Sequence, residues 1–380
     1  MNSSLILSST LSPAAGGLSA SVPNLAHGLD RAGADAVHVV GLEDPDDPEA
    51  AQAWGPQVHA HRPVGPRAFG YAPGIERTLA HLAPSVIDVQ GLWTYPSLAN
   101  LRHHRRHGTP YVVTPHGMLD PWARARSRWK KRAVRLWFED AHLAQAACLR
   151  ATAEMEAEHF RSFGLTNPIA IVPNGVDIPD LSGVARSRGS RRRALFLSRI
   201  HPKKGLPYLL DAWAAIEAQH PDWELVIAGP DEVGHTAEMQ ARADRLGLKR
   251  VLWRPAVHGA DKTALYRSAD LFVLPTHAEN FGLVIAEALA HEVPVITTRN
   301  APWAGLETHG CGWWIPLDET QLREALTEAT ALPRAALDDM GTRGRAWMAR
   351  DFGWDGVAER MLEVYRWVGD GGARPDCLYD

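Results

Sequence analysis

Short apolar runs alternate with longer amphipathic segments along nearly all of the 380 residues. Each run has the length of a buried β-strand, and the segments between them, such as 206–219 and 236–246, carry apolar residues at helical spacing. Strands that alternate with helices predict βαβ units and parallel sheets. The expected strands are residues 5–7, 36–40, 86–89, 111–114, 148–151, 169–172, 194–198, 225–228, 251–253, 271–274 and 294–297.

The series is interrupted once, by the polar and basic stretch at residues 177–193. Such composition is typical of a linker or an exposed loop. Because domains usually contain roughly 100–200 residues, this chain should form two. We predict the α/β class, with doubly wound domains over residues 1–173 and 190–353 joined by a linker over 174–189. In open α/β sheets ligands bind at the carboxyl ends of the strands, so two such domains facing each other would form a cleft.

Composition excludes several classes of protein. The net charge of -4 gives no general attraction to nucleic acid or to an anionic membrane, so a basic site must be local. Cys148, Cys311 and Cys377 are far apart and odd in number, which favours a reducing compartment over a disulfide framework. No apolar run is long enough for a transmembrane helix, and the N-terminal apolar run lacks the basic region of a signal peptide.

Two loops in the first half follow predicted strands. In SPAAGGLSASVPNLAHGL, Gly16 and Gly17 precede a helix expected from near Ser19. A glycine pair before a helix allows close approach to a phosphate, although an ordinary turn is the simpler interpretation. In YVVTPHGMLDPW, His116 comes just after a strand, a position compatible with either a structural or a functional histidine.

A third loop, SRIHPKKG, places Arg199 directly after a strand and Lys204 before the next helix. A guanidinium and an ammonium that converge there would suit a diphosphate. The alternative is a solvated basic turn. We favour the diphosphate site because the charges lie at the strand end and not along an exposed helix face.

The stretch THAENFGLVIAEALA contains two glutamates eight positions apart, Glu279 and Glu287. Glu279 lies in the loop after a predicted strand, where its carboxylate could accept hydrogen bonds from ligand hydroxyls. Glu287 lies in a helix that is apolar on all sides, which predicts burial. Its carboxylate would then either pair with a core arginine or a backbone group, or bind a diol such as a ribose.

Residues 121–142 form a predicted basic amphipathic helix. We interpret it as a surface helix whose tryptophans face the core, with an anionic membrane or a phosphorylated acceptor as the alternative ligand of its basic face. The face with aromatic residues is expected to hold Trp122, Trp129, Leu136 and Trp137, and the opposite face Arg124, Arg128, Lys131, Arg132 and Arg135.

Several common site patterns are missing from the sequence. There is no convincing DxD metal-binding loop, nucleophile elbow, P-loop or cluster of histidine and cysteine ligands. We therefore expect no bound metal and no cofactor.

Taken together, these loops resemble the retaining glycosyltransferases of family 4, which have the GT-B fold of two Rossmann-like domains facing across a cleft. The motifs that carry the resemblance are the E-x7-E pair, SRIHPKKG (198–205), the glycine pair, TPHGM (114–118) and IVPNGVD (171–177). Their order and spacing extend along nearly the whole chain.

The resemblance implies a role for each motif residue. Arg199 and Lys204 would bind the donor diphosphate, Glu279 the transferred sugar and Glu287 the ribose. The backbone of Phe281, Gly282 and Leu283 would contact the sugar and phosphate, Gly16 and Gly17 the phosphate, and His116 the sugar or acceptor. Helix 354–380 would pack back on the N-terminal domain. The acceptor or membrane side would comprise Arg124, Arg128, Lys131 and Arg132.

The resemblance implies metal-independent, retaining transfer of a hexosyl unit from a UDP- or GDP-linked sugar to a carbohydrate or lipid-linked acceptor. This fits bacterial polysaccharide or glycolipid biosynthesis in the cytoplasm, with the protein peripheral to the inner face of the membrane. A nucleotide-sugar epimerase and a non-catalytic nucleotide-sugar-binding protein are the alternatives. Three segments depart from the family pattern and leave the donor open: Asn280, RNAPWAGL (299–306) and GPDEVGH (229–235).

Overall fold

The computed structural model describes residues 4–125, 128–182 and 186–379. These residues divide into two compact units. Unit 1 comprises residues 1–175 and 354–380, and unit 2 comprises residues 176–353. Each unit has an α/β architecture built on one largely or wholly parallel sheet, as the alternation of apolar runs and amphipathic segments predicted.

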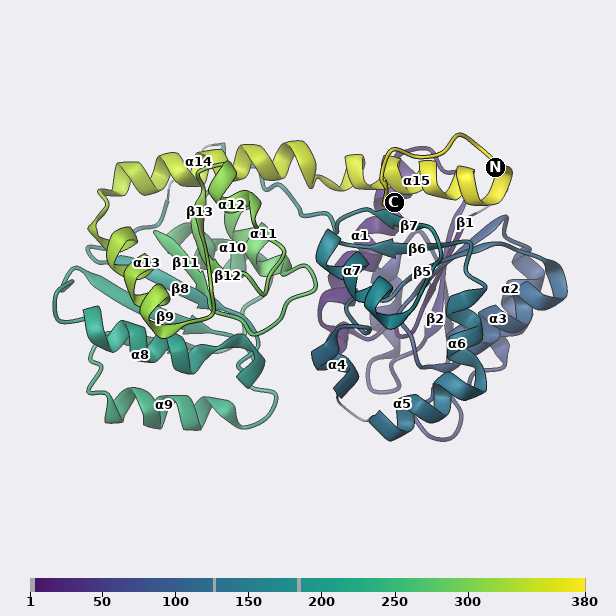
Figure 1. The fold of residues 1–380 in the computed structure, drawn as a ribbon, viewed down its shortest axis with the longest axis horizontal. Coiled ribbons are helices and arrows are strands. Elements are labelled where there is room, and N and C mark those ends of the chain that lie inside the picture. The colour runs from purple at the N-terminus through teal and green to yellow at the C-terminus, as the bar shows by residue number, and fades with distance from the viewer. Residues whose placement is uncertain (1–3, 126–127, 183–185, 380) are drawn as a thin grey trace. The chain divides into compact units, whose positions relative to one another are not determined.

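The sheet of unit 1 (Figure 1) contains, within the described residues, eight strands in the order β14-β7-β6-β5-β4-β1-β2-β3. All neighbours are parallel except the antiparallel pair β14 and β7. The strands are β1 (Ser4–Ser8), β2 (Val37–Leu42), β3 (Gln57–His61), β4 (Val86–Gln90), β5 (Tyr111–Thr114), β6 (Cys148–Ala151), β7 (Ile169–Ile171) and β14 (Leu378–Tyr379).

Helices cover both faces of this sheet. Successive side chains of β1 point to opposite faces of the sheet. Leu5 and Leu7 belong to the apolar cluster on one face, and Ile6 belongs to the cluster on the other. The helices of unit 1 are α1 (Gly17–Arg31), α2 (Gly74–Leu82), α3 (Tyr95–His107), α4 (Pro121–Ala125), α5 (Arg128–Val134), α6 (Asp140–Ala144), α7 (Glu154–Phe163) and α15 (Trp354–Asp370), with 3-10 segments Pro13–Ala15 and Pro48–Trp54 and a π-helical turn Arg135–Glu139.

The last long helix, α15, packs against α1 in unit 1. At the contact, a Cβ on Gly28 would lie 3.1 Å from the Cβ of Ala358, so glycine permits close approach of the two helices. The indole of Trp354 lies against Gly175, where any side chain would collide with the ring. Burial of Val357, Met361 and other side chains along one face of α15 closes the apolar cluster over this face of the sheet.

Six strands form the sheet of unit 2 within the described residues, all parallel, in the order β10-β9-β8-β11-β12-β13. The strands are β8 (Arg192–Leu197), β9 (Trp223–Ala228), β10 (Val251–Arg254), β11 (Leu271–Leu274), β12 (Val295–Thr298) and β13 (Gly312–Ile315). The helices are α8 (Leu206–Ile216), α9 (His235–Arg245), α10 (Gly259–Ser268), α11 (Leu283–Ala290), α12 (Gly305–Thr308), α13 (Glu319–Ala331) and α14 (Arg334–Asp351), with a 3-10 turn Pro202–Lys204.

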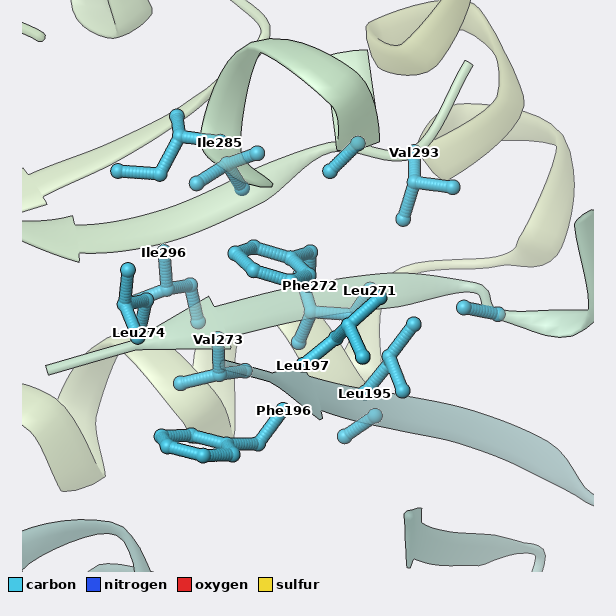
Figure 2. Close-up of a cluster of buried hydrophobic side chains, with 14 of the residues drawn as sticks. Leu195, Phe196, Leu197, Leu271, Phe272, Val273, Leu274, Ile285, Val293 and Ile296 are labelled. Atoms are coloured by element: carbon cyan, nitrogen blue, oxygen red, sulfur yellow. The ribbon is translucent and has the colours of Figure 1, made fainter. Parts of the chain in front are cut away.

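The central strands of unit 2 are apolar on both faces because helices cover both (Figure 1). Figure 2 shows the side chains of β8 and β11 alternating across the sheet, with Ile285 of α11 over one face. Phe196, Phe272 and Ile285 are fully buried. This packing holds the ends of β8 and β11, from which the loops SRIHPKKG and THAENFGL emerge.

Three strands were missed in the sequence, the two-residue β14 and the longer β3 and β13. β3 reads QVHAH and none of its residues is fully buried, so it lacks the apolar run that marks a central strand. β13 reads GWWI and is equally only partly buried. Both lie at the edge of their sheets, where one side of a strand faces solvent and composition is a weaker signal.

The basic stretch at 177–193 is not simply a solvated linker. Arg186 and Arg188 form ion pairs with Asp338, and Arg188 also pairs with the fully buried Asp270. The expectation of an exposed loop was wrong for these two side chains, because carboxylates of unit 2 neutralise their charges. The sequence alone could not show where those carboxylates lie.

Candidate functional site

The strand order of unit 2 reverses between β8 and β11, which makes this the topological switch point of the sheet. Ligands of doubly wound sheets bind outside the carboxyl ends of the strands at such a point. The loop after β8 carries Lys204 and the loop after β11 carries Glu279. Their side chains form an ion pair, and they are only 9% and 10% exposed.

Gly205 allows the Lys204 turn to approach the end of β11. It has φ +70, and a Cβ there would collide with the carbonyl oxygen of Pro275. The turn is also tied to the second loop, because His277 N and Thr276 Oγ1 both donate to the carbonyl oxygen of Lys203, at 2.8 and 3.1 Å. The two charged loops are therefore fixed to each other by backbone contacts.

The unusual loop 299–306 supports Glu279. Glu279 N donates to the carbonyl oxygen of Asn300 at 2.9 Å, and the Trp303 indole donates to the carbonyl oxygen of Phe281 at 2.5 Å. Gly282 then adopts φ +82 at the N-cap of α11, with no side chain capping that end. Loop 299–306 thus holds the glutamate loop by two hydrogen bonds.

Glu287 is not buried as predicted. Its side chain is 23% exposed, and its carboxylate accepts from Lys262 Nζ at 2.6 Å and from the Tyr266 hydroxyl at 2.9 Å. Burial beside this carboxylate raises the pKa of Tyr266 well above its ordinary value, so the hydroxyl remains a donor. The partners are a lysine and a tyrosine of α10, four residues apart on one helix face, and neither was identified in the sequence.

Arg199 has a carboxylate partner of its own. Its Nη1 lies 3.0 and 2.9 Å from the two carboxylate oxygens of Glu232, in the loop after β9, and its side chain is 48% exposed. Arg199 and Lys204 are therefore each held by a different carboxylate, and their convergence on a diphosphate stays a prediction.

A cavity of about 430 Å³ lies at the carboxyl ends of β9 and β10. Gly229, Trp253 and Arg254 line it, and so does Asp231, whose carboxylate accepts from three backbone N–H groups at the start of α9. The sequence did not single out this cavity, although the glycine and proline that follow β9 mark a loop at a strand end.

His116 of unit 1 has a constrained backbone and a fixed ring. Its φ of +52 is uncommon for a residue with a side chain, and such conformations cluster at functional sites. Its Nε2 lies 2.5 Å from Oε1 of Gln90, the last residue of β4. Burial, with the Arg150 guanidinium nearby, lowers the pKa of His116 to about 3, so the ring is neutral at neutral pH.

The glycine pair lies at the start of α1, which begins at Gly17 and not near Ser19. Gly16 has φ +63, and the space around a Cβ built on it is open. No side chain caps this end of the helix. The N–H groups of the first turn are thus free of a side-chain acceptor, as a phosphate site would require.

The orientation predicted for residues 121–142 was wrong. Trp129, Leu136 and Trp137 are 74%, 79% and 63% exposed, so their side chains do not face the core. Instead, the guanidinium groups of Arg124 and Arg135 lie over the Phe163 ring, at 4.8 and 4.4 Å. A guanidinium can stack on an aromatic face, so an arginine is able to occupy the inner side of a surface helix.

The other basic residues of this segment differ in their surroundings. Lys131 Nζ donates to the carbonyl oxygen of Ala123 at 2.5 Å and lies 5.6 Å from the centre of the Trp93 ring. Arg132 is exposed. The side chain of Arg128 lies outside the described part of the structure, as do residues 126 and 127, so α4 and α5 are described as separate helices.

The structure also bears on disulfides, metal ligands and membrane-spanning helices. Cys148, Cys311 and Cys377 are all free. Residues 4–125, 128–182 and 186–379 contain no group of three or more histidine, cysteine or acidic side chains that could hold a metal ion. Over the same ranges, every helix is too short or too polar to cross a bilayer.

The depressed pKa of His116 predicts acid sensitivity. A group that binds its proton only near pH 3 when folded, but near 6.5 when unfolded, stabilises the fold fully above 6.5, and this contribution falls as the pH drops toward 3. Between pH 6.5 and 5 the free energy of unfolding falls by about 2 kcal/mol at most through this group. Urea unfolding at pH 7 and pH 5 should show a smaller acid loss for His116→Asn than for the wild type, and equal losses would contradict the assignment.

Comparison with known proteins agrees with this arrangement. Residues 177–347 match the family model "Glycosyl transferases group 1", and residues 16–175 match "Glycosyl transferase 4-like domain". The GDP-mannose:cellobiosyl-diphosphopolyprenol alpha-mannosyltransferase of Xanthomonas campestris is 26% identical over 369 residues, which is 93% of each chain.

Solved structures share the fold. A sucrose-phosphate synthase from Thermosynechococcus elongatus superimposes with a TM-score of 0.76 at 21% identity, over 97% of this chain and 100% of that one. Anabaena HepE in complex with UDP-glucose gives a TM-score of 0.74 at 20% identity, over 95% and 98% of the two chains.

The two doubly wound units, together with these matches, define a glycosyltransferase of the GT-B class. Within that class, the chain belongs to the group 1 glycosyl transferases of the family 4 type. The resemblance drawn from E-x7-E and SRIHPKKG is confirmed, and the epimerase alternative finds no support.

Proposed function

We propose that this protein moves a hexosyl unit from a UDP- or GDP-linked sugar to an acceptor hydroxyl, with retention of configuration and without a bound metal. The observation that carries the proposal is the Lys204–Glu279 pair at the switch point of unit 2, with Glu287 on the helix that follows. A cation for a phosphate and two carboxylates for hydroxyls are the groups that a sugar nucleotide requires.

Each group has a distinct task in the proposed complex. Lys204 and Arg199 contact the diphosphate, Glu279 accepts hydrogen bonds from the sugar, and Glu287 accepts them from the ribose. The backbone N–H groups at 281–283 add donors at the N-terminus of α11. The cavity beside Trp253 and Arg254 has the size and position to take the nucleobase.

Unit 1 carries proposed ligand contacts of its own. The open start of α1 at Gly16 and Gly17 contacts the phosphate, and His116 contacts the sugar or the acceptor. Its neutral ring suits a hydrogen-bonding group and not a proton carrier, because a pKa of about 3 lies far from neutral pH.

The chemistry follows from where charge develops. Breaking the bond between sugar and phosphate places positive charge on the anomeric carbon and negative charge on the leaving diphosphate. Fixed cations and N–H dipoles directed at that diphosphate lower the barrier. With retention, the acceptor attacks the face from which the diphosphate departs, so a phosphate oxygen takes the acceptor proton.

A donor screen tests this proposal. The full chain is incubated with UDP-, GDP- and ADP-sugars, and free sugar, nucleotide and any new sugar nucleotide are measured. Slow release of sugar and nucleotide diphosphate from one donor supports a transferase, and the anomeric configuration of a transferred product reports retention. Interconversion of sugar nucleotides, or binding without turnover, would contradict the proposal. Activity that is abolished by EDTA and restored by a divalent ion would overturn metal independence.

We further propose that the acceptor is lipid-linked and that the enzyme works in the cytoplasm, peripheral to the inner face of the membrane. The apolar-basic surface of unit 1, defined by Trp129, Lys130, Arg132, Leu136 and Trp137, supports this. Exposed tryptophans beside cations suit an interface with anionic lipid. The Xanthomonas relative is named for an acceptor carried on a diphosphopolyprenol.

Flotation with lipid vesicles tests whether the apolar-basic surface binds a membrane. The protein should float with phosphatidylglycerol vesicles at low salt and less at high salt, because screening weakens attraction to an anionic surface. Replacement of Trp129, Leu136 and Trp137 by serine should reduce the bound fraction about tenfold or more, since each removes apolar burial worth roughly 1.5–3 kcal/mol.

The matched control is Val233→Ser, which removes an exposed apolar side chain from unit 2. It should float like the wild type. Absence of wild-type binding at low salt, or equal loss in Val233→Ser, would show that the apolar-basic surface does not bind anionic lipid.

A further inference from the structure

We propose that Gln90 is a positioning residue that holds His116 with its proton on Nε2, so that the Nδ1 lone pair accepts a hydrogen bond from a hydroxyl of the bound sugar. The inference rests on the proposed function of the site, because it assigns one atom of His116 to the ligand. It also adds three buried groups that the sequence motifs do not include, Gln90, Asp88 and Tyr365, which are linked through Thr114 of the TPHGM motif.

These groups form a continuous chain of hydrogen bonds. Gln90 Oε1 meets His116 Nε2 at 2.5 Å, and Gln90 Nε2 donates to Thr114 Oγ1 at 3.4 Å. Thr114 Oγ1 donates to Asp88 Oδ1 at 3.1 Å, and the Tyr365 hydroxyl donates to Asp88 Oδ2 at 2.6 Å. Gln90 and Thr114 are wholly buried, so water does not substitute for the bond between them.

The direction of the chain follows from its far end. Burial beside Asp88 raises the pKa of Tyr365 well above its ordinary value, so its hydroxyl stays protonated and donates. The Tyr365 hydroxyl donates to Oδ2 of Asp88 and the Thr114 hydroxyl donates to Oδ1, so both oxygens of Asp88 accept. The Thr114 hydroxyl gives its only proton to Asp88, so toward Gln90 its oxygen accepts, which directs the Gln90 NH2 toward Thr114 and the Gln90 oxygen toward His116.

An amide oxygen can only accept, so His116 must donate from Nε2. A neutral imidazole has one N–H, which leaves Nδ1 as an acceptor. Among the described residues no hydrogen bond engages that nitrogen. Since ligand hydroxyls are donors, the free lone pair of Nδ1 matches a sugar hydroxyl.

The position of Gln90 in the fold supports a role at the ligand. It ends β4, and the strand order of unit 1 reverses between β1 and β4, as that of unit 2 does between β8 and β11. Arg150 fixes the surroundings, because it donates to the carbonyl oxygens of Val172 and Pro173 at 3.0 and 2.9 Å. Burial raises the pKa of Asp88, and the nearby Arg150 guanidinium opposes this effect.

A spectroscopic experiment tests the hydrogen-bond direction without reference to activity. The full chain is labelled with 15N-histidine, and the His116 signals are assigned by their absence in His116→Asn. The expected spectrum has a pyridine-type nitrogen at Nδ1 and a pyrrole-type nitrogen at Nε2. The opposite tautomer, or a mixture, would overturn the proposal.

A double-mutant cycle tests the function of the contact. Hydrolysis of GDP-mannose and of UDP-glucose is measured for the wild type, Gln90→Leu, His116→Asn and the double variant. Gln90→Leu should lower kcat/KM about tenfold alone and less than about twofold when Asn replaces His116, because it acts through that ring. Asparagine is chosen because it tolerates positive φ. Equal effects in both backgrounds would overturn the positioning role.

Two further variants separate this role from a loss of packing. Thr114→Val should lower kcat/KM and Thr114→Ser should restore it, whereas Ser97→Ala, which removes a buried hydroxyl elsewhere in unit 1, should leave it unchanged. If the wild type hydrolyses neither donor, the choice of donor fails while the 15N result still decides the tautomer. The two proposals therefore fail separately.

Discussion

Lys204→Met should lower kcat for sugar transfer by roughly 10²–10³-fold, the loss typical when one preorganised group that stabilises transition-state charge is removed. The ammonium is held at the switch point by Glu279 and is almost wholly shielded from water. There it is worth more to a leaving diphosphate than it would be in solvent. The rate is measured at saturating donor, with the donor found by the screen, so that weaker binding does not contribute.

The variant also leaves Glu279 shielded and unpaired, which is costly by itself. The double variant Lys204→Met, Glu279→Gln removes both charges and should recover thermal stability while remaining inactive. Lys249→Met, an exposed lysine of unit 2, provides the control for a lost positive charge. Transfer within about threefold of the wild-type rate in Lys204→Met would remove Lys204 from the diphosphate site.

Gly205→Ala should lower the free energy of unfolding of unit 2 by about 3 kcal/mol or more and abolish transfer. Two costs combine at this position. An alanine at φ +70 is strained, and its Cβ would overlap the Pro275 carbonyl oxygen, so the turn that carries Lys204 must separate from the end of β11. Urea unfolding and donor turnover are the measurements.

The chain offers a control with the same backbone angle. Gly247 also has φ +70, but nothing lies within 4 Å of a Cβ built on it. In Gly247→Ala the backbone is therefore strained but the new Cβ overlaps no other atom. The variant should lower the free energy of unfolding by about 1 kcal/mol and leave transfer unaffected. If the two alanine variants were equally stable, the close approach of the Lys204 turn to Pro275 would not matter.

The sequence predicted those parts of the fold and site that depend on local patterns. Central strands such as β11 are continuous apolar runs, and glycines such as Gly205 mark places where the backbone must turn sharply. Once the strands are predicted, the loops that follow them are predicted too. The order of the motifs along the chain is enough to indicate the family, because it does not depend on the strand order.

The partners of the charged residues could not be predicted in this way. Glu287 meets Lys262 and Tyr266, and Arg199 meets Glu232, across distances in sequence that no periodicity records. The orientation of the basic helix failed for a different reason. Tryptophan was assigned to the core by its hydrophobicity, but Arg124 and Arg135 occupy the inner side because Phe163 offers them an aromatic face.

The packing of α15 on α1 sets an order of events during synthesis. Residues 176–353 contain every strand and helix of unit 2, so that unit has its full set of contacts as soon as Gly353 has left the ribosome. Unit 1 is begun first but completed last, because Tyr365 and the apolar face of α15 are made after all of unit 2. Until then Asp88 lacks its tyrosine donor, and the cluster around Val22 and Leu25 is uncovered. The nascent chain therefore carries an unfinished first unit throughout the translation of the second.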